Sequence, residues 1–306
     1  MKKIWLFSLL TLLLCALCLM TVGAADKVVY LADGGTGDGT SASAPVGTLA
    51  DAYTALGDGG GTVVLCGTYT VGANVKTPVH TGTVTFTSVY GETDYRTSGA
   101  NLLFAGSYHL RLQGATVFDN IKIVTKTGTP YVAANFNPIT FGYNVQTVNA
   151  SGTNTRLRVV GGSKSDRTVE ALPAGQSSTM EFYSGYYTVF AFSNDVSSLT
   201  HEGTMYITVG GTASIVDFWV GIYNSTTSYG GSADITFKDS AKVTNSLYMA
   251  GNKAGMYLNG DITVRVQDEA SIALIKYSDK ETLFPNHTRT LEITGDDASQ
   301  IGRAHV

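Results

Sequence analysis

The chain has 306 residues and a formal net charge of −4, from 20 Lys and Arg against 24 Asp and Glu. This mildly acidic balance without basic clusters argues against nucleic acid and anionic lipid as partners. Charged residues make up only 14% of the chain, below the roughly 25% of an ordinary globular domain, but a hydrophobic content of 43% excludes a disordered chain.

The N-terminus has the three parts of a secretory signal peptide, which we place at residues 1–24. Met1-Lys2-Lys3 is basic, residues 4–20 are apolar, and small residues at 21–25 provide a cleavage-like site. We expect a secreted or cell-surface protein with no membrane span in its mature chain. The alternative is a membrane anchor, for which the apolar run is near the lower limit of about 17–25 residues.

Cleavage would leave Cys66 as the single cysteine, because Cys15 and Cys18 lie in the expected signal peptide. One cysteine cannot form an intrachain disulfide, so packing must hold the exported fold together. Loss of Lys2 and Lys3 lowers the basic count from 20 to 18 against 24 acidic residues, which makes the formal charge −6.

Residues 25–60 are predicted to form an N-terminal cap with one amphipathic helix. A Gly-rich loop at 33–40 precedes it. Thr48 and Asp51 then have capping-box spacing, and Gly57 ends the helical pattern. The apolar positions between them recur at helical spacing and are Leu49, Ala52, Tyr53 and Leu56. Such a stripe is expected to cover the open first coil of a repeat fold.

From residue 61 onward the chain consists of short β-branched or aromatic runs bounded by Gly, Asn, Asp or Ser, which is the strand signature. The predicted strands are 62–65, 84–87, 102–104, 110–112, 121–124, 139–141, 157–160, 180–183 and 189–192. No second helix interrupts them, so an α/β sheet with helical crossovers is not expected.

Four segments in the C-terminal half repeat one another and align on Ala213, Ala241, Ala270 and Ala298, at steps of 28, 29 and 28 residues. A fixed period of this size is typical of stacked repeats. Three short strands and three turns fit in one such period, whereas sandwiches and up-and-down barrels carry none. We therefore predict an all-β fold, a parallel β-helix with three strands per coil over residues 61–300. Ile215, Val243 and Ile272 would form an interior aliphatic column in it, and the alanines a small-residue column at a corner.

Residues 28–69 resemble the opening of secreted right-handed β-helix proteins of the pectin-lyase-like superfamily. The resemblance rests on Asp38-Gly39-Thr40, Thr48-Leu49, Gly60-Gly61-Thr62 and Gly67-Thr68-Tyr69, and residues 114–121 are similar to the coil pattern of that family. It implies a right-handed helix, an N-terminal helical cap and association with polysaccharides. It implies no activity.

Residues 301–306 match the translation of a common short-read sequencing adapter, ATC GGA AGA GCA CAC GTC. In the repeat alignment Gln300 falls at the position of Ile215, so the pattern breaks where adapter sequence would begin. We expect a truncated reading frame with an artefactual end, so that the β-helix at 61–300 is incomplete. Arg303 and His305 therefore carry no functional argument.

Acidic residues occupy equivalent turns of adjacent repeats. Stacked turns would form an acidic edge for a hard cation, with calcium as the candidate, made by Asp239, Asp268, Glu269, Asp296 and Asp297. The alternative is a solvated turn in which Asp is simply good turn chemistry. Asp33 and Asp38 in the first loop lack EF-hand spacing, and a plain Gly-rich turn is favoured there.

No catalytic residue can be named from the sequence. A glycosidase needs two carboxyl groups about 5–9.5 Å apart, and Gly295-Asp296-Asp297 is like only part of the polygalacturonase pattern. The scattered histidines lack metal-ligand spacing such as HExxH, and no GxSxG elbow is present; they are His80, His109, His201 and His287.

Aromatic residues are frequent in the repeating half, and any on the outer face could stack on sugar rings. The cluster comprises Tyr183, Tyr186, Tyr187, Phe218, Trp219, Tyr223, Tyr229, Tyr248, Tyr257 and Tyr277. The candidates for glycan stacking are Tyr186, Tyr187, Trp219, Tyr223 and Tyr248. The alternative is that these rings pack in the core or in turn stacks.

Two functional hypotheses follow. The first is a non-catalytic secreted or cell-surface β-solenoid, an adhesin-like or glycan-contacting module whose partner is a polysaccharide or a host or cell-surface glycan. The second is a pectin-lyase-like polysaccharide lyase or glycoside hydrolase with part of the protein missing. The regular repeat, the low charge and the lack of a polar constellation favour the first.

Overall fold

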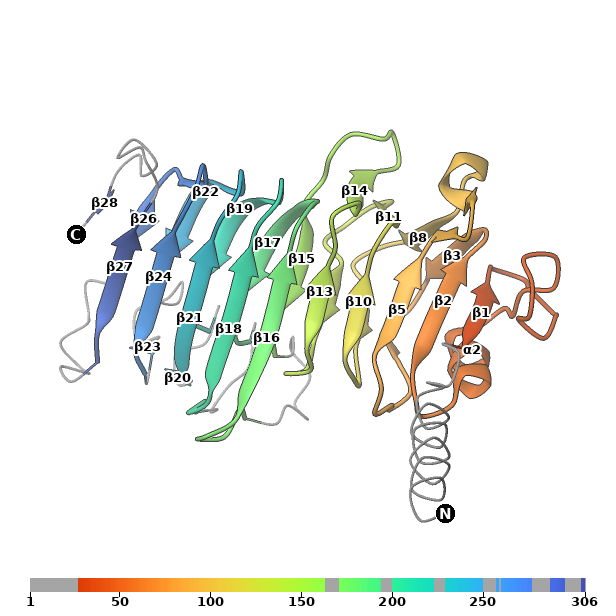
Figure 1. Ribbon diagram of the computed structural model, residues 1–306, viewed down its shortest axis with the longest axis horizontal. Coiled ribbons are helices and arrows are strands. Elements are labelled where there is room, and N and C mark those ends of the chain that lie inside the picture. Colours follow the sequence, from red (N-terminus) through yellow and green to blue (C-terminus); the bar gives the residue numbers. More distant parts are fainter. Residues whose placement is uncertain are drawn as a thin grey trace, which may run out of the picture.

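The computed structural model describes residues 27–162, 171–193, 200–222, 229–249, 257–258, 260–276, 287–294 and 304–305. Over these residues the chain is a parallel β-helix, in which successive coils stack along one long axis (Figure 1). All strand pairs in its three main sheets are parallel, as the repeat period predicted, and the helix precedes the coils.

Sheet A forms one face along the whole length of the described coils. Its strands, in spatial order, are β1 (Val28–Leu31), β2 (Gly61–Leu65), β5 (Val84–Thr87), β10 (Thr116–Phe118), β13 (Ile139–Phe141), β16 (Ser177–Phe182), β18 (Thr204–Val209), β21 (Ser232–Phe237), β24 (Ile262–Val266) and β27 (Arg289–Ile293).

Sheets B and C form the other faces. Sheet B contains β3 (Thr68–Val71), β8 (Asn101–Phe104), β11 (Lys122–Thr125) and β14 (Gln146–Asn149). Sheet C contains β4 (Val75–Lys76), β9 (His109–Arg111), β12 (Tyr131–Ala133), β15 (Leu157–Val160), β17 (Tyr186–Phe190), β19 (Ser214–Trp219), β22 (Lys242–Tyr248), β25 (Ser271–Ile272), β26 (Ile275–Lys276) and β28 (Ala304–His305).

Several short elements lie outside the three main sheets. After β5 the chain makes an antiparallel pair, β6 (Val89–Tyr90) and β7 (Thr93–Asp94), and then the 3-10 helix η2 (Tyr95–Ser98). A short parallel pair, β20 (Tyr229–Gly230) and β23 (Tyr257–Leu258), accompanies the later coils.

Each coil up to β15 has three strands, as predicted, and two later coils also have a third strand, because β20 follows β19 and β23 follows β22. Beyond β15, sheet B receives no further strand from the described residues, and the chain passes directly from β16 to β17, from β18 to β19 and from β21 to β22. These connections are tight turns between strands of five to seven residues. The repeats seen in the sequence are therefore the end of a sheet A strand, the turn, and the start of a sheet C strand.

The helix α2 (Leu49–Leu56) forms as its capping pattern predicted. The Asp51 N–H donates to Thr48 Oγ1 at 3.1 Å, and the Thr48 hydroxyl donates to Asp51 Oδ2 at 2.6 Å. Gly57 ends the helix at φ +70°, a conformation that favours glycine. The apolar stripe is buried, and the helix lies beside β1 at the N-terminal end of the coils (Figure 1).

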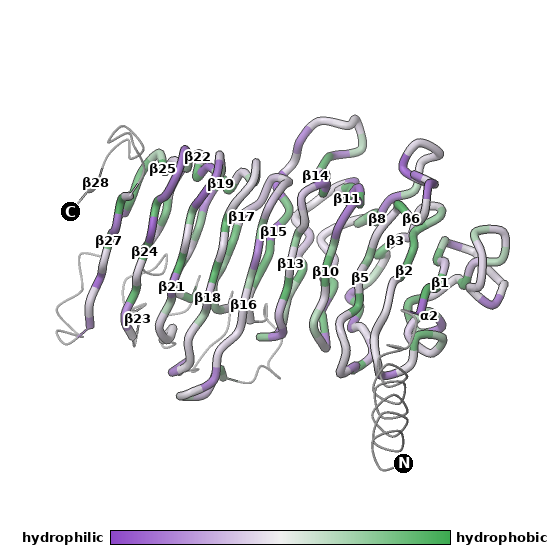
Figure 2. The backbone as a smooth tube through the Cα atoms, viewed as in Figure 1, coloured by the Kyte–Doolittle hydropathy of each residue, from purple (hydrophilic) through white to green (hydrophobic). Residues whose placement is uncertain are grey.

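Interior side chains stack in columns along the axis. Phe86, Phe118, Phe141 and Phe182 are consecutive partners in sheet A, with ring centroids 5.4, 5.1 and 5.4 Å apart and interplanar angles of 17°, 14° and 8°. Hydrophobic residues recur along the strands, whereas hydrophilic ones gather near the strand ends (Figure 2). The core is thus a continuous set of stacked rings and aliphatic side chains.

The two columns predicted from the repeat are present. Ile215 pairs with Val243, and Val243 with Ile272, and all three are buried. Ala213, Ala241 and Ala270 are fully buried, and the N–H groups that follow the last two donate to the carbonyls of the first two. Ala298 lies outside the described residues. Equivalent positions therefore superimpose along the axis as expected.

Within the described part of the chain, no helix is long and apolar enough to cross a membrane. Cys66 is a free, partly buried thiol, and burial raises its pKa. The signal-peptide region at residues 1–24 lies outside the described residues.

Tyr187 is fully buried in the interior, with its ring 5.0 Å from both Phe141 and Phe182. Its hydroxyl has no hydrogen-bond partner among the residues that the structure describes. Because an unpartnered buried hydroxyl costs about 1–3 kcal/mol, we expect Tyr187→Phe to raise the free energy of unfolding by about 1 kcal/mol. Tyr187→Ala should lower it by about 3–5 kcal/mol, since it leaves a cavity. Denaturant unfolding measures both, and a clearly destabilised Tyr187→Phe variant would contradict the expectation.

His201 is a second buried polar side chain. Its Nδ1 accepts from the Leu172 N–H at 3.0 Å, and the rings of Phe136 and Phe192 lie 5.0 and 5.5 Å away. Burial lowers the pKa of His201 from 6.5 to about 4. The folded chain therefore holds this imidazole neutral where the unfolded chain would protonate it.

As the pH is lowered from about 6.5 to 4, this residue should consequently lower the free energy of unfolding by about 2–3 kcal/mol. The unfolded chain binds a proton in this window that the folded chain cannot bind, and above pH 6.5 the effect is absent. We expect His201→Gln to lose this part of the difference in unfolding free energy between pH 7.5 and pH 4.5. His109→Gln, a change in a half-buried histidine, should keep it. An unchanged pH dependence in His201→Gln would refute the assignment.

Candidate functional site: a polar groove where sheet B ends

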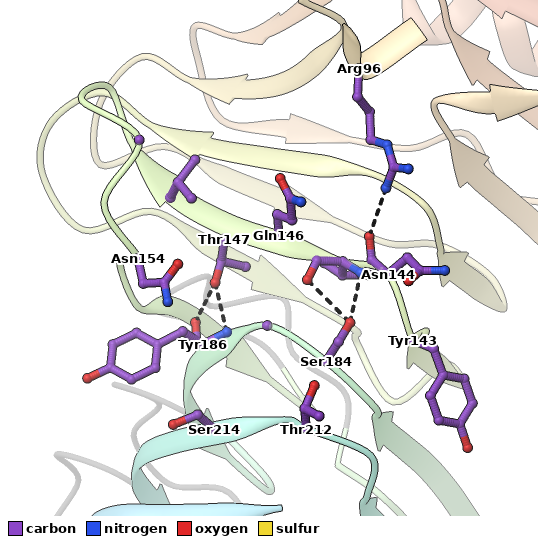
Figure 3. Close-up of a pocket in the computed structure, with 14 residues that line it drawn as sticks. Arg96, Tyr143, Asn144, Gln146, Thr147, Asn154, Ser184, Tyr186, Thr212 and Ser214 are labelled. Atoms are coloured by element: carbon purple, nitrogen blue, oxygen red, sulfur yellow. Dashed lines mark hydrogen bonds between the residues drawn. The ribbon is translucent and has the colours of Figure 1, made fainter. Parts of the chain in front are cut away.

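A groove of about 770 Å³ lies where sheet B stops. One wall is β14, the last strand of sheet B, and the other is the turn at 183–185 with the starts of β17 and β19 (Figure 3). The residues that line it are Arg96, Tyr143, Asn144, Val145, Gln146, Thr147, Val148, Gly152, Asn154, Ser184, Gly185, Tyr186, Thr212 and Ser214. The groove thus marks the place where sheet B ends and the chain begins to turn directly from sheet A into sheet C.

Two hydroxyl side chains connect the walls in place of a strand. Ser184 Oγ accepts from the Val145 N–H at 2.7 Å and donates to the Gly142 carbonyl. Thr147 Oγ1 accepts from the Tyr186 N–H at 2.7 Å and donates to the Tyr186 carbonyl at 3.1 Å. These bonds hold the two walls together, because each joins a side chain of one wall to backbone groups of the other.

The outer edge of β14 is also closed. The chain folds back after the strand, so that the Asn149 N–H donates to the Thr153 carbonyl at 2.8 Å and the Thr155 N–H to the Thr147 carbonyl at 3.0 Å. Asn149 Oδ1 accepts from the N–H groups of Ser151 and Thr153, both at 3.0 Å. The backbone of β14 is therefore not available on this side to pair with a peptide strand. The exposed hydrogen-bonding groups of the groove belong to side chains.

Those side chains are mostly neutral. Gln146, Asn154 and Thr212 are exposed and make no side-chain hydrogen bond within the described part of the chain. Amides and hydroxyls both donate and accept hydrogen bonds. The middle of the groove is consequently able to bind a ligand rich in hydroxyl groups.

Tyrosine rings stand at both ends of the groove (Figure 3). Tyr143 is 62% exposed, and its ring stacks on that of Tyr183 with centroids 4.7 Å apart. Gly211 makes this possible, because a Cβ there would lie 2.2 Å from the Tyr183 carbonyl oxygen and 3.3 Å from Tyr143 Cδ1. Tyr186, at the other end, is half-buried. Two aromatic surfaces therefore flank a polar centre.

The 3-10 helix η2 carries Arg96, whose side chain lines the groove. Its guanidinium binds the Asp94 carboxylate through two bonds, Nε to Oδ1 at 2.9 Å and Nη2 to Oδ2 at 2.7 Å. Its Nη1 donates to the Asn144 carbonyl at 3.3 Å. The Arg96 hydrogen bond holds the pKa of the Asp94 carboxyl below its usual value, and Asp94 raises the pKa of Arg96. The pair therefore remains ionised together.

The predicted acidic edge is organised as a ladder of turn residues. Asp239 Oδ2 accepts from the Gly211 N–H at 2.7 Å, and Asp268 Oδ2 accepts from the Asp239 N–H at 3.0 Å. Glu269 Oε2 accepts from the Ser240 hydroxyl at 3.1 Å. Each Asp thus binds a backbone N–H group one coil earlier, which gives the acidic residues a structural role in these turns.

Calcium binding at this edge stays a prediction of the sequence. Asp296 and Asp297 lie outside the described residues. Among the described residues, no group of three or more His, Cys, Asp or Glu side chains is placed to hold a metal ion. In the first loop, Asp33 accepts from Thr70 and Asp38 from Thr40, so these two carboxylates serve separate turns.

The aromatic candidates lie in different places. Tyr186 lines the groove, whereas Tyr187 is enclosed in the core and cannot contact a glycan. Trp219 is 7% exposed and stacks on Tyr248, with centroids 3.4 Å apart. Tyr223 lies outside the described residues.

Trp219 and Tyr248 belong to a row on the outer face of sheet C that also includes Tyr131 and Phe190. Lys276 Nζ lies 4.7 Å from the Tyr248 ring centroid, on a neighbouring strand. The large faces of the Trp219 and Tyr248 rings therefore contact neighbouring side chains. This arrangement favours the interpretation of these two residues as packing residues.

No family model, curated protein or solved structure matches this chain. The resemblance to pectin-lyase-like proteins therefore stays a prediction, and the geometry of the groove is what bears on function.

Sequence reasoning missed most of the groove. Tyr143 was not among the aromatic candidates, and Arg96, Gln146 and Asn154 stand in no recognised motif. The available signal was positional, because Tyr143 and Tyr183 both follow closely on the last Phe of a sheet A strand, Phe141 and Phe182. Tyr143 lies two residues after Phe141 and Tyr183 one residue after Phe182, so the two rings are offset by one position and still become neighbours in stacked coils.

The ladder role of Asp239 predicts how substitutions behave. Asp239→Asn keeps an acceptor oxygen and tolerates the φ of +56°, so it should change the unfolding free energy by less than about 0.5 kcal/mol. Asp239→Ala should cost about 1 kcal/mol, because the Gly211 N–H loses its acceptor. Thermal or denaturant unfolding with and without calcium tests this. Calcium-dependent stabilisation that disappears in Asp239→Asn would instead favour the cation edge.

Proposed function

We propose that this protein is a non-catalytic, secreted or cell-surface β-solenoid that contacts glycans through the groove at the end of sheet B. The observation that carries the proposal is the pairing of an exposed, stacked tyrosine, Tyr143, with a row of unengaged amide and hydroxyl side chains. Sugars present apolar ring faces and many hydroxyls, so they require both kinds of surface.

The shape of the site supports an extended ligand. The groove is open and is held by backbone hydrogen bonds through Ser184 and Thr147, so its walls are fixed before a ligand binds. Preorganised walls lower the entropic cost of binding. A rigid stack of coils also suits a protein that displays a binding surface at a distance from its attachment point.

The lyase or hydrolase alternative finds less support at this groove. A glycosidase uses two carboxyl groups, and the described lining residues contain none. Arg96, the cation among them, is bound to Asp94 and is poorly suited to act as a base.

Binding to a panel of soluble polysaccharides tests the proposal. The panel contains xyloglucan, galactomannan, polygalacturonate and alginate, and affinity gel electrophoresis or calorimetry measures the affinity. We expect Tyr143→Ala to weaken binding about 5- to 30-fold, since loss of a stacking surface costs about 1–2 kcal/mol. Tyr206→Ala is the matched control, because Tyr206 is 48% exposed on a sheet A strand and does not line the groove.

Absence of binding to every polymer of the panel would contradict the proposal, and so would equal loss in the two tyrosine variants. Release of unsaturated oligosaccharides during incubation would instead support the lyase alternative.

A further inference from the structure

We infer that the groove selects neutral glycans over uronate-bearing ones, because its cation is engaged by an internal carboxylate while neutral side chains face the ligand. This inference rests on the proposed glycan-binding function and names the substrate class of the same site.

Arg96 is the one cation among the described lining residues, so it would be the group to recognise a uronate carboxylate. A guanidinium binds a carboxylate best through two parallel N–H groups. Asp94 already occupies such a pair, Nε and Nη2, and Nη1 donates to the Asn144 carbonyl. These bonds leave two of the five guanidinium N–H groups. A ligand carboxylate would therefore meet a guanidinium whose charge is already balanced by Asp94, two residues away in the chain.

Further carboxylates lie near Tyr183 and Arg96. Glu181 and Asp239 lie near the Tyr183 ring, and after burial they are causes of the raised pKa of Tyr183. Asp119 lies close enough to Arg96 to contribute to its raised pKa. Lys238 Nζ lies 5.7 Å from the Tyr183 ring centroid and offsets one of these charges. The remaining negative charge on the Tyr143 side of the groove repels a polyanion, most strongly at low ionic strength.

The hydroxyl groups of a neutral glycan are not repelled by these negative charges. Gln146 and Asn154 each offer an amide donor and an amide acceptor, and Thr212 offers a hydroxyl. The Tyr143 ring presents an apolar face to a pyranose ring. A neutral chain can therefore satisfy the groove without breaking the Asp94 to Arg96 pair.

The first test is the selectivity of the unaltered protein. We expect affinity for a neutral chain, galactomannan or xyloglucan, at least about tenfold higher than for polygalacturonate or alginate at low salt, with the gap narrowing as salt is added. This comparison requires no variant. Equal or tighter binding of the uronate polymers would overturn the inference.

The second test releases the guanidinium. Asp94→Asn retains an oxygen that can accept from the Arg96 N–H, which caps η2, but removes the negative charge. We expect affinity for polygalacturonate to rise about tenfold in a salt-sensitive way, while affinity for the neutral chain changes less than about twofold. The double variant Asp94→Asn, Arg96→Gln should return uronate binding to the original level.

The outcomes separate the two claims. Unchanged uronate binding in Asp94→Asn overturns the selectivity inference, and the Tyr143→Ala result still decides the glycan-binding function. Absence of binding to all four polymers overturns the glycan-binding function itself. Thermal unfolding of each variant establishes that the fold is retained.

Discussion

In-register parallel stacking of the coils is the constraint on which the rest of this structure depends. Each sheet A strand hydrogen-bonds to its equivalent in the next coil, so a side chain lies above its counterpart at about 4.8 Å. The rings from Phe86 to Phe182 accept this spacing in a near-parallel stack. A slip of one residue would turn these rings outward and bring threonines such as Thr85 and Thr140 inward, so burial itself fixes the register.

The groove arises where this regularity changes. Along sheet A, Ile139 is followed by Met180, whereas later interior positions follow at Ile207, Ile235 and Val264. The long coil after Ile139 contains the last strand of sheet B. Coil length does not explain the stop, because the coil from Thr116 to Ile139 is shorter than the later ones and still contains β11. Beyond the boundary the chain instead turns directly from sheet A into sheet C. Ser184 and Thr147 satisfy the backbone groups left at that boundary. A recess lined by polar side chains is the result, on a scaffold held rigid by its neighbours.

Internal pairing explains how a chain of low charge uses the carboxylates that it has. Asp239 and Asp268 bind backbone N–H groups, Asp94 binds Arg96, and Arg265 binds both Asp234 and Glu292. Such contacts hold turns and strands in register. The carboxylates that bind backbone N–H groups keep their charge, whereas the Asp94 to Arg96 ion pair balances the charge of the cation that lines the groove.

The sequence by itself determined the class of fold, the capping helix and the interior columns. The capping box at Thr48 and the repeat at Ala213, Ala241 and Ala270 were legible because each depends on local spacing or on a constant period. The sequence also located strands that belong to sheet A, and the register between them then followed from stacking. Export, the pectin-lyase-like resemblance and the nature of the chain end stay predictions of the sequence.

Only the tertiary structure decided where sheet B ends, which aromatic residues are exposed and which carboxylates are engaged. Tyr186 and Tyr187 are adjacent in the chain, yet one lines the groove and the other lies in the core, because neighbouring residues of a strand point to opposite faces. Arg96, Tyr143 and Thr212 come from different coils. They share one surface because parallel stacking brings distant segments side by side, and no local pattern encodes the coil at which a sheet stops.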